Sequence, residues 1–292
     1  MERILLLGGS GILGSEVLLQ LQRDNFDYVA PASRDLDIRN KDQVINFVSH
    51  FKPAWIVNCA AWTNVDGAES HFNEAMELNA RAVQNIGDAV AEIRSRVIHI
   101  STDYVFDGKS SVPYSEIDPT SPINAYGKSK LEGELTLRRN LENDSFLIRT
   151  SWLYGKNGKN FVKTIIGKAL AQETCTVVGD QFGTPTYSRD LAVGIVNSIK
   201  NPMPPGTYHY SNLGEASWYE FARTIYQMLG VDPNLVSMSV TADIKQRTPR
   251  PTYSVLSKEK WLGTKVSGIP DWQTSLELAM PEILIAVRNE NA

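Results

Sequence analysis

The sequence predicts a doubly wound α/β fold, in which helices cover both faces of a parallel sheet, together with a smaller C-terminal lobe. Two observations lead to this prediction. Over the first 151 residues, short apolar runs alternate with segments whose apolar residues recur at helical spacing. The first apolar run also ends in a glycine-rich turn that opens a helical segment. Such alternation is typical of βαβ units with right-handed crossovers, which produce a parallel sheet.

The predicted strands are short apolar runs bounded by polar residues or glycine: 3–9, 27–33, 54–61, 96–101 and 145–151. The predicted helices between them carry apolar residues at helical spacing: 12–23, 40–51, 68–92 and 122–142. Asn40 is a suitable N-cap for the second helix, and Ser121-Pro122 is expected to open the last one. A sheet built this way binds ligands at the carboxyl ends of its strands.

Beyond residue 151 the alternation loosens. The segments GDQFGTPT (179–186) and KQRTPRPTYS (245–254) are rich in Gly, Pro and Thr, as loops are. We therefore predict a ligand-binding domain over 1–151 and a lobe over 152–292 that closes over the ligand edge. The apolar runs TCTVV and GTYHYSN predict later returns to the sheet, near residues 175–210.

Composition excludes several classes of function. The chain has 292 residues, 42% of them hydrophobic and 21% charged, and a formal net charge of −4 without a long basic run. A nucleic-acid partner is therefore not expected. The first apolar run is too short for a membrane span or a signal peptide. Cys59 and Cys175 lie in predicted strands, where buried cysteines in a reducing compartment are expected. We predict a cytoplasmic protein without a membrane association.

A glycine loop follows the first predicted strand. Gly8, Gly11 and Gly14 have the spacing G-x-x-G-x-x-G in GGSGILG. Residues without Cβ let backbone N–H groups approach a pyrophosphate, and the following helix adds the partial positive charge of its N-terminus. Between a first strand and a first helix this pattern predicts a dinucleotide site. A tight turn without a ligand is the alternative.

The end of the second predicted strand bears on the choice of cofactor. An acid there would bind the 2′-hydroxyl of an adenine ribose, but this chain has Ser33 and Arg34. A guanidinium beside a hydroxyl favours a 2′-phosphate and therefore NADPH. Asp35 and Asp37 lie close by, so NADH is the alternative, and Arg34 could instead be a solvated surface residue.

The segments HISTDYVFDG (99–108) and NAYGKSK (124–130) supply a candidate catalytic group. Tyr126 and Lys130 are four residues apart, so they share one face of a helix, and Thr102 ends the fourth predicted strand. A phenol has an ordinary pKa of about 10, which a nearby ammonium lowers. We predict that Tyr126 exchanges a proton with a substrate that Thr102 holds. An exposed helix face is the alternative for the Tyr–Lys pair by itself.

These motifs resemble the extended short-chain dehydrogenase/reductase superfamily and, more narrowly, the dTDP-4-dehydrorhamnose reductase family. The Tyr-x-x-x-Lys element is common to the superfamily, whereas STDYVFDG and DQFGTPT are more specific to the narrower family. The resemblance covers nearly the whole chain, through NCAAWTNVDGAE (58–69), ISTDYVFDG (100–108), NAYGKSKLEGE (124–134), IRTSWLYG (148–155), VVGDQFGTPT (177–186), SWYEFA (217–222) and RPTYSVL (250–256).

The resemblance implies a Rossmann-like cofactor domain with a substrate-binding lobe and assigns further residues. The implied cofactor contacts are Gly11, Ile12 and Leu13 at the pyrophosphate, Asp37 and Ile38 at the adenine, Ala61, Trp62 and Thr63 along the cofactor, Lys130 at the nicotinamide ribose, and Asn79 as a supporting helix residue. The implied substrate contacts are Thr63, Val65, Thr102, Asp103 and Trp152. Asp103 could instead cap a turn, and Trp152 could belong to the core. Trp62 replaces a smaller aromatic that is usual in this family.

The resemblance also implies the reaction: NADPH-dependent reduction of a dTDP-linked 4-keto-6-deoxy sugar, dTDP-4-dehydro-β-L-rhamnose, for cell-surface polysaccharide. A reductase or epimerase of another nucleotide sugar is the first alternative. A non-catalytic regulatory subunit of the methionine adenosyltransferase type is the second. Some members of the family dimerise through a magnesium ion held by glutamates. Glu16 fits one such position, but Asp190 stands where a glutamate is expected, so no metal site is predicted, and the chain is expected to be a monomer or homodimer.

Overall fold

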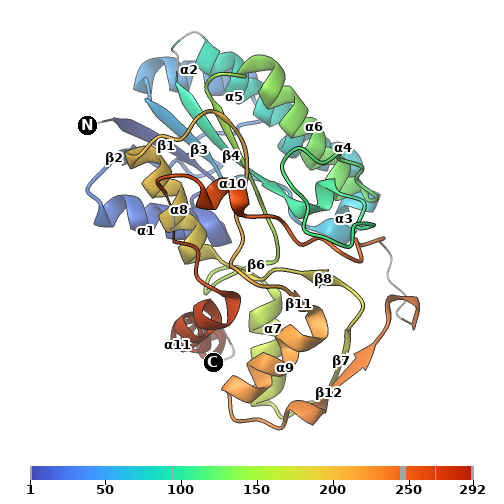
Figure 1. Ribbon diagram of the computed structural model, residues 1–292. Coiled ribbons are helices and arrows are strands. Elements are labelled where there is room, and N and C mark those ends of the chain that lie inside the picture. The colour runs from blue at the N-terminus through green and yellow to red at the C-terminus, as the bar shows by residue number, and fades with distance from the viewer. Residues whose placement is uncertain (1, 92, 94, 244–247, 267, 291–292) are drawn as a thin grey trace.

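The computed structural model describes residues 2–91, 93, 95–243, 248–266 and 268–290. The last residue of the predicted helix 68–92 and part of the predicted loop 245–254 lie outside these ranges. The described chain forms an upper body built on a parallel sheet and a lower lobe of helices and short strands (Figure 1). None of the described helices is both long and apolar enough to span a bilayer.

Within the described residues, the central sheet has six parallel strands in the order β10-β5-β4-β3-β1-β2. Their bounds are β1 Arg3–Leu7, β2 Asp27–Val29, β3 Trp55–Asn58, β4 Arg96–Thr102, β5 Ser145–Thr150 and β10 Gly206–His209. The order in which strands are added to the sheet reverses between β1 and β3, because β2 lies on one side of β1 and all later strands of the sheet lie on the other. The structure thus confirms the doubly wound α/β fold, and this reversal is where such folds bind ligands.

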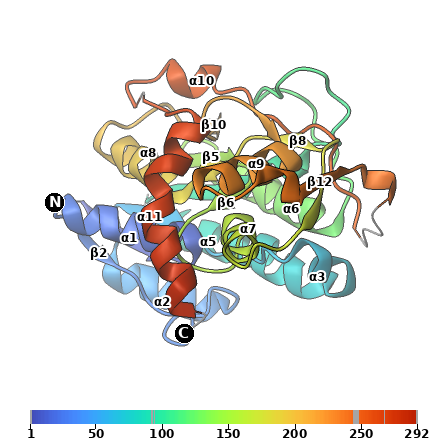
Figure 2. The ribbon, with the colours of Figure 1, turned by 90° about the horizontal axis from the view of Figure 1, so that it is seen from below.

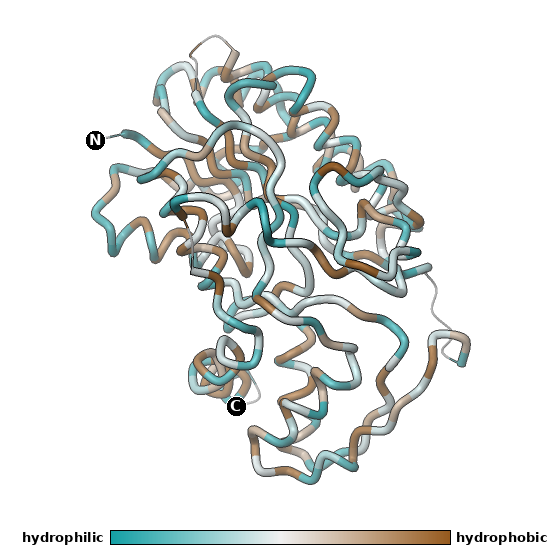
Figure 3. The backbone as a smooth tube through the Cα atoms, viewed as in Figure 1, coloured by the Kyte–Doolittle hydropathy of each residue, from teal (hydrophilic) through white to brown (hydrophobic). Residues whose placement is uncertain are grey.

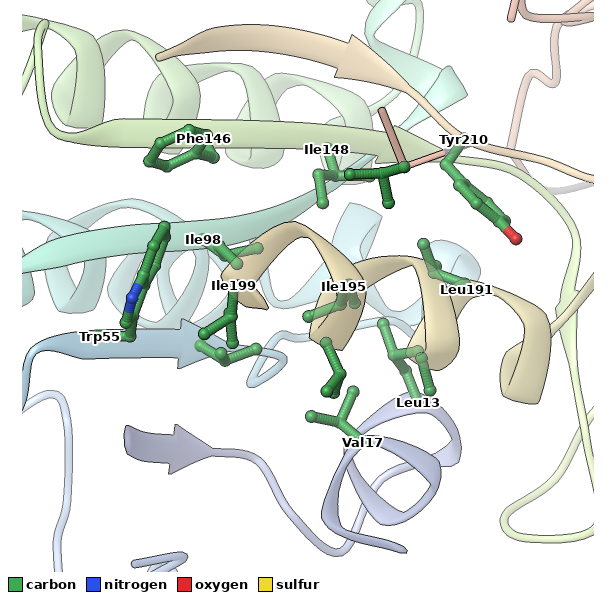
Figure 4. Close-up of a cluster of buried hydrophobic side chains, with 14 of the residues drawn as sticks. Leu13, Val17, Trp55, Ile98, Phe146, Ile148, Leu191, Ile195, Ile199 and Tyr210 are labelled. Atoms are coloured by element: carbon green, nitrogen blue, oxygen red, sulfur yellow. The ribbon is translucent and has the colours of Figure 1, made fainter. Parts of the chain in front are cut away.

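Helices cover both faces of the sheet, as Figure 1 shows. On one face α1 (Ile12–Arg23) packs against α8 (Ser188–Lys200). On the other, α5 (Ala82–Ala91) lies between α2 (Lys41–Phe51) and α6 (Ala125–Asn140). The α8 side chains Leu191, Ile195 and Ile199 point between the strands and α1 (Figure 4). Burying such side chains contributes roughly 1.5–3 kcal/mol each, so α8 belongs energetically to the sheet domain although it lies late in the sequence.

The lobe carries a second hydrophobic core. Figure 3 shows apolar residues both along the central strands and within the helices of the lobe, and Figure 2 shows α11 crossing the lower face of the molecule. The elements of this part are α7 Phe161–Leu170, α9 Trp218–Met228, α11 Trp272–Glu290, β6 Leu153–Tyr154, β7 Cys175–Val178, β8 Phe182–Gly183, β9 Thr186–Tyr187, β11 Ala216–Ser217 and β12 Val236–Ser239. A short helix, α10 (Glu259–Leu262), returns to β10.

Three sequence predictions differ from the structure. The first concerns the returns to the sheet: β10 joins β5, but β7 pairs with β12 in the lobe. The second concerns the predicted helix 68–92, which is divided into α3 (Val65–Ser70), α4 (Phe72–Met76), a π-helical turn (Glu77–Arg81) and α5. The third concerns α6, which begins at Ala125 because Asn124, and not Ser121, caps it by accepting from Gly127 N.

Candidate active site

A cleft of about 540 Å³ lies at the carboxyl ends of the strands, between the sheet and the lobe. It brings together segments that are far apart in the sequence. Its lining includes Gly11, Ile12, Leu13, Cys59, Ala61, Thr63, Val65, Thr102, Asp103, Tyr104, Tyr126, Lys130, Trp152, Phe161, Trp218, Phe221 and Arg250. All three predicted catalytic residues and all five predicted substrate residues are in this set.

The glycine loop begins the cleft at the reversal point of the sheet. Gly8 has a φ of +77°, and a Cβ there would lie 2.6 Å from the Ala60 nitrogen. A Cβ on Gly14 would lie 2.0 Å from the Gly8 carbonyl oxygen. Gly11 faces the cleft and occupies the N-cap position of α1, where no side chain caps the helix. The N–H groups at the start of α1 therefore remain available to an anion, so the loop fits a dinucleotide pyrophosphate.

Asn79 joins the loop after β3 to α6. Its Oδ1 accepts from the Trp62 nitrogen at 2.8 Å, and its Nδ2 donates to the Trp62 carbonyl and to Ser129 Oγ at 3.1 and 2.9 Å. Ala61 and Thr63 line the cleft on either side of this anchored residue. Asn79 and Trp62 do not line it in the described part of the chain; the Trp62 ring stacks on His71 instead. Asn79 is thus placed to support the site rather than to contact a ligand directly.

The predicted adenine-side residues lie outside the cleft lining of the described chain. Ser33 and Arg34 are exposed in the turn after β2. The Arg34 side chain is 87% exposed, and among the described residues its ion pair is a distant one with Asp35, at 3.7 Å. Asp37 is held by Arg39 at 2.8 Å, which keeps the pKa of Asp37 below its usual value through hydrogen bonding. Arg34 is therefore accessible to a ligand at this edge, whereas Arg39 is engaged.

Tyr126 and Lys130 come from the first turns of α6 and face Thr102 at the end of β4. Burial raises the pKa of Tyr126 to about 12, and hydrogen bonding by Thr102 opposes that shift. Lys130 is 2% exposed, and its Nζ donates to the Ile100 carbonyl at 2.6 Å. Burial lowers the pKa of Lys130 to about 8, against the nearby negative charge of Glu134.

This geometry corrects one detail of the sequence interpretation. Lys130 was expected to lower the pKa of Tyr126, but burial dominates, and the neighbour that lowers the pKa is the Thr102 hydroxyl. The reason is that Lys130 directs its ammonium group to the backbone of β4. A phenol is protonated at neutral pH at either value, but the raised pKa makes it a weaker acid, so the opposing hydrogen bond from Thr102 favours a proton-donating role.

Trp152 has an unusual conformation on the lobe side of the cleft. Its φ is +46°, a left-handed value that is strained for a bulky residue. Its ring stacks on Trp218, with centroids 3.5 Å apart and planes 9° apart, and a Cβ on Gly183 would collide with it at 2.4 Å. Packing between α9 and β8 therefore fixes the indole. Trp152 lines the cleft and is also packed, and its contact with a substrate remains a prediction.

Several cleft residues were missed from the sequence. Trp218 and Phe221 were interpreted as packing residues because of their helical spacing, yet both line the cleft. Arg250 reaches it from the C-terminal part of the chain and pairs with Asp66 of α3 at 3.1 Å. The motif RPTYSVL contained Arg250, but no local pattern indicates that this residue returns to the cleft.

The residues near Glu16 do not fit a magnesium site. Glu16 is buried and lies 3.4 Å from Lys156 Nζ and 3.5 Å from Arg189 Nε. Asp190 Oδ2 accepts from Asn212 and Ser275 at 2.8 and 2.5 Å. Two cations beside Glu16 oppose a third, and no group of three or more His, Cys, Asp or Glu side chains suited to a metal occurs among the described residues.

The fold and the site define the class of this protein. A glycine loop lies at the reversal point of a doubly wound sheet, and Thr102, Tyr126 and Lys130 gather in the adjoining cleft. This arrangement is that of an oxidoreductase of the extended short-chain dehydrogenase/reductase class.

Comparison with known proteins identifies the family. The sequence model of the RmlD substrate binding domain matches residues 1–285, so the chain belongs to that family. The dTDP-4-dehydrorhamnose reductase of Aggregatibacter actinomycetemcomitans is 38% identical over 289 residues, covering 95% of this chain and 98% of that protein. A probable dTDP-4,6-dihydroxy-2-methyloxan-3-one 4-ketoreductase of Streptomyces antibioticus is 37% identical, covering 97% and 96%.

A solved structure agrees with this assignment. The dTDP-4-dehydrorhamnose reductase of Bacillus anthracis, crystallised in complex with NADP, superposes with a TM-score of 0.91 at 37% identity, covering 96% of this chain and 99% of that one. The resemblance found in the sequence motifs is therefore confirmed, and the match extends through the lobe as well as the sheet domain.

Proposed function

We propose that the protein reduces the C4 ketone of dTDP-4-dehydro-β-L-rhamnose to give dTDP-L-rhamnose, with NADPH as the reductant. The observation that carries this proposal is the convergence of Thr102, Tyr126 and Lys130 in one cleft beside the glycine loop. Relatives that cover nearly the whole chain are named as reductases of dTDP-linked keto sugars, which supports the substrate class.

The roles of the chain's own residues follow from the site. The cofactor, when bound, supplies a hydride to the substrate carbon. Tyr126, which is protonated at neutral pH, donates its phenolic proton to the carbonyl oxygen, and the hydrogen bond from Thr102 offsets part of the acidity that burial removes. Lys130 holds a positive charge near the developing oxyanion, and its lowered pKa of about 8 leaves it largely protonated at pH 7. Asn79 anchors the loop at Trp62 to α6, so that cofactor and acid keep their relative positions.

Replacing Tyr126 with Phe tests the acid. The change removes only the hydroxyl, so kcat should fall by roughly 10²–10⁴-fold, while the Kd for NADPH should stay within about twofold. Ketone-dependent loss of NADPH absorbance measures the first quantity, and cofactor fluorescence measures the second. A Tyr126→Phe enzyme that keeps its kcat would overturn the assignment.

NADPH is the proposed cofactor because Arg34 is exposed after β2 and no described residue forms a close ion pair that would compete for it. The NADP complex of the Bacillus anthracis relative supports this choice. Arg34→Ala should reduce the ratio of kcat/KM for NADPH to that for NADH by about tenfold, as expected for one lost charged hydrogen bond. Arg23→Ala, an exposed arginine at the far end of α1, is the matched control. An unchanged ratio in Arg34→Ala would contradict the role.

The alternative candidate substrate is another nucleotide-linked 4-keto-6-deoxy sugar, with a different ring configuration. The name of the Streptomyces antibioticus relative favours this candidate, because it describes a 4-ketoreductase for a different dTDP sugar. A panel of dTDP-, GDP- and UDP-linked 4-keto sugars, assayed with NADPH, separates the candidates, and NMR of the product gives the configuration at C4. If none of the sugars in the panel is reduced, the proposed function is refuted. Cytoplasmic location and a monomeric or homodimeric state remain predictions.

A further inference from the structure

Asp103 directly follows Thr102 at the end of β4 and is 2% exposed, with its side chain in the cleft lining. Thr102 Oγ1 donates to Asp103 Oδ1 at 3.0 Å, and the Tyr104 nitrogen donates to Thr102 Oγ1 at 3.2 Å. In this arrangement the single proton of the Thr102 hydroxyl points to the carboxyl group, although the same hydroxyl is also within hydrogen-bonding reach of Tyr126.

The arrangement conflicts with the task of a ketone-reducing site. Hydride transfer places negative charge on the carbonyl oxygen, and hydroxyl donors stabilise that charge. A threonine hydroxyl has one proton to donate, so Thr102 cannot serve Asp103 and the substrate oxygen together. A neutral carboxyl group can instead donate to Thr102 Oγ1, which releases the threonine proton. The second oxygen, Oδ2, is buried without a well-formed hydrogen bond among the described residues, although the Ser254 hydroxyl lies near the carboxyl group, and such burial is costly for a carboxylate.

The surroundings favour a carboxyl group that changes protonation near neutral pH. Burial raises the pKa of Asp103 to about 7, against smaller lowering effects of hydrogen bonds from Ser254 and Thr102. The other titratable groups around it are Tyr104 on the same turn and Tyr126 on α6, and the negative charge of Asp103 raises the pKa of both. Arg250 also interacts with Tyr104 and opposes the rise of its pKa.

We propose that Asp103 is a positioning residue: its neutral carboxyl group releases the Thr102 hydroxyl to donate to the substrate carbonyl oxygen, and its carboxylate withdraws that hydroxyl. The inference rests on the proposed ketone reduction and adds a specific role to it. Asp103 then acts through Thr102 and not as a direct sugar contact. Reduction is fastest when Asp103 is protonated and falls as the pH rises through the Asp103 titration.

The first test needs no substrate. Carbon-13 NMR of labelled aspartate carboxyl groups in the full chain with NADPH follows the Asp103 titration, and the signal lost in Asp103→Asn assigns it. Thr102→Val removes the donor to the carboxylate, so the titration midpoint should rise by about one pH unit. Asp107→Asn, a nearby aspartate outside the cleft lining, should leave the midpoint unchanged. A Thr102→Val midpoint equal to that of the wild type overturns the inference.

The second test is the pH dependence of kcat/KM for the 4-keto sugar between pH 6 and 9. The wild type should lose about tenfold in rate for each pH unit above the Asp103 titration. Thr102→Ser should keep this dependence, because it retains the hydroxyl. Asp103→Asn and Thr102→Val should both lose the decline centred near pH 7 and keep only the separate decline near pH 8 that deprotonation of Lys130 causes. Thr102→Val covers the case in which Asp103→Asn does not fold.

The outcomes separate the two hypotheses. If Asp103→Asn keeps the wild-type dependence on pH, the positioning role is wrong although reduction stands. If the carboxyl titration shifts as expected but no 4-keto sugar in the panel is reduced, the proposed function fails, whereas the hydrogen bond between Asp103 and Thr102 is upheld.

Discussion

Glu134 and Arg149 form a buried ion pair beneath the cleft, and replacing Glu134 with Gln should strongly destabilise the protein. The two side chains are 0% and 1% exposed. Arg149 donates to both carboxylate oxygens, at 2.9 and 2.7 Å, and Ser101 Oγ donates to the same carboxylate at 2.5 Å. Gln keeps the shape of Glu134 but leaves the guanidinium charge buried without its counter-ion.

The magnitude follows from that burial. Breaking a buried pair by removing one partner costs about 3–5 kcal/mol. For a chain of this size, about 1 kcal/mol lowers the melting temperature by roughly 2–4 °C, so Tm should fall by about 10 °C. Glu134 also opposes the lowering of the Lys130 pKa by burial, so the pKa of Lys130 should fall further in the variant.

Differential scanning calorimetry at fixed pH measures the effect. Glu132→Gln, on the same helix, is the matched control, because Glu132 and its partner Arg139 are exposed and such pairs contribute at most about 1 kcal/mol. Replacing both buried partners, as in Glu134→Leu with Arg149→Met, should recover much of the lost stability. Equal melting temperatures for Glu134→Gln and Glu132→Gln would refute the reasoning.

Two further predictions concern the walls of the cleft. Gly14→Ala would place a Cβ 2.0 Å from the Gly8 oxygen, so the loop must shift, and the affinity for NADPH, measured by fluorescence titration, should fall at least tenfold. Gly167→Ala is the matched control because the space around Gly167 is open. Equal affinities of the two variants would contradict the prediction. Trp218→Ala removes the ring stacked on Trp152, so the KM for the sugar should rise about tenfold in steady-state assays, while the affinity for NADPH stays unchanged. An unchanged KM would exclude a role of Trp218 in sugar binding.

Local patterns in the sequence were sufficient for much of the sheet domain. Asn40 caps α2 as predicted, because its side chain accepts from the Gln43 nitrogen within the same turn. The glycine spacing predicted the loop between β1 and α1, since close backbone approach at Gly14 depends on residues that are near in sequence. The three candidate catalytic residues could be named because their strand-end and helix positions bring them to one edge.

Other features depended on contacts that no short segment contains. The predicted helix 68–92 is interrupted where Asn79 bonds to Trp62 and Ser129, 17 and 50 residues away. The strand at 175–178 has an apolar pattern suited to either sheet, and its pairing with β12 in the lobe decided its place. The carboxylate of Glu134 is paired with Arg149, from the next strand of the sheet.

The sequence by itself determined the doubly wound fold, the glycine loop and the chemical groups available for catalysis, because helix periodicity, strand composition and glycine spacing are local properties. Only the tertiary structure decided how those groups are tuned. Burial raises the pKa values of Tyr126 and Asp103, and Lys130 turns to the Ile100 carbonyl. Desolvation and long-range packing depend on which distant segments surround a residue, and spacing along the chain does not encode them.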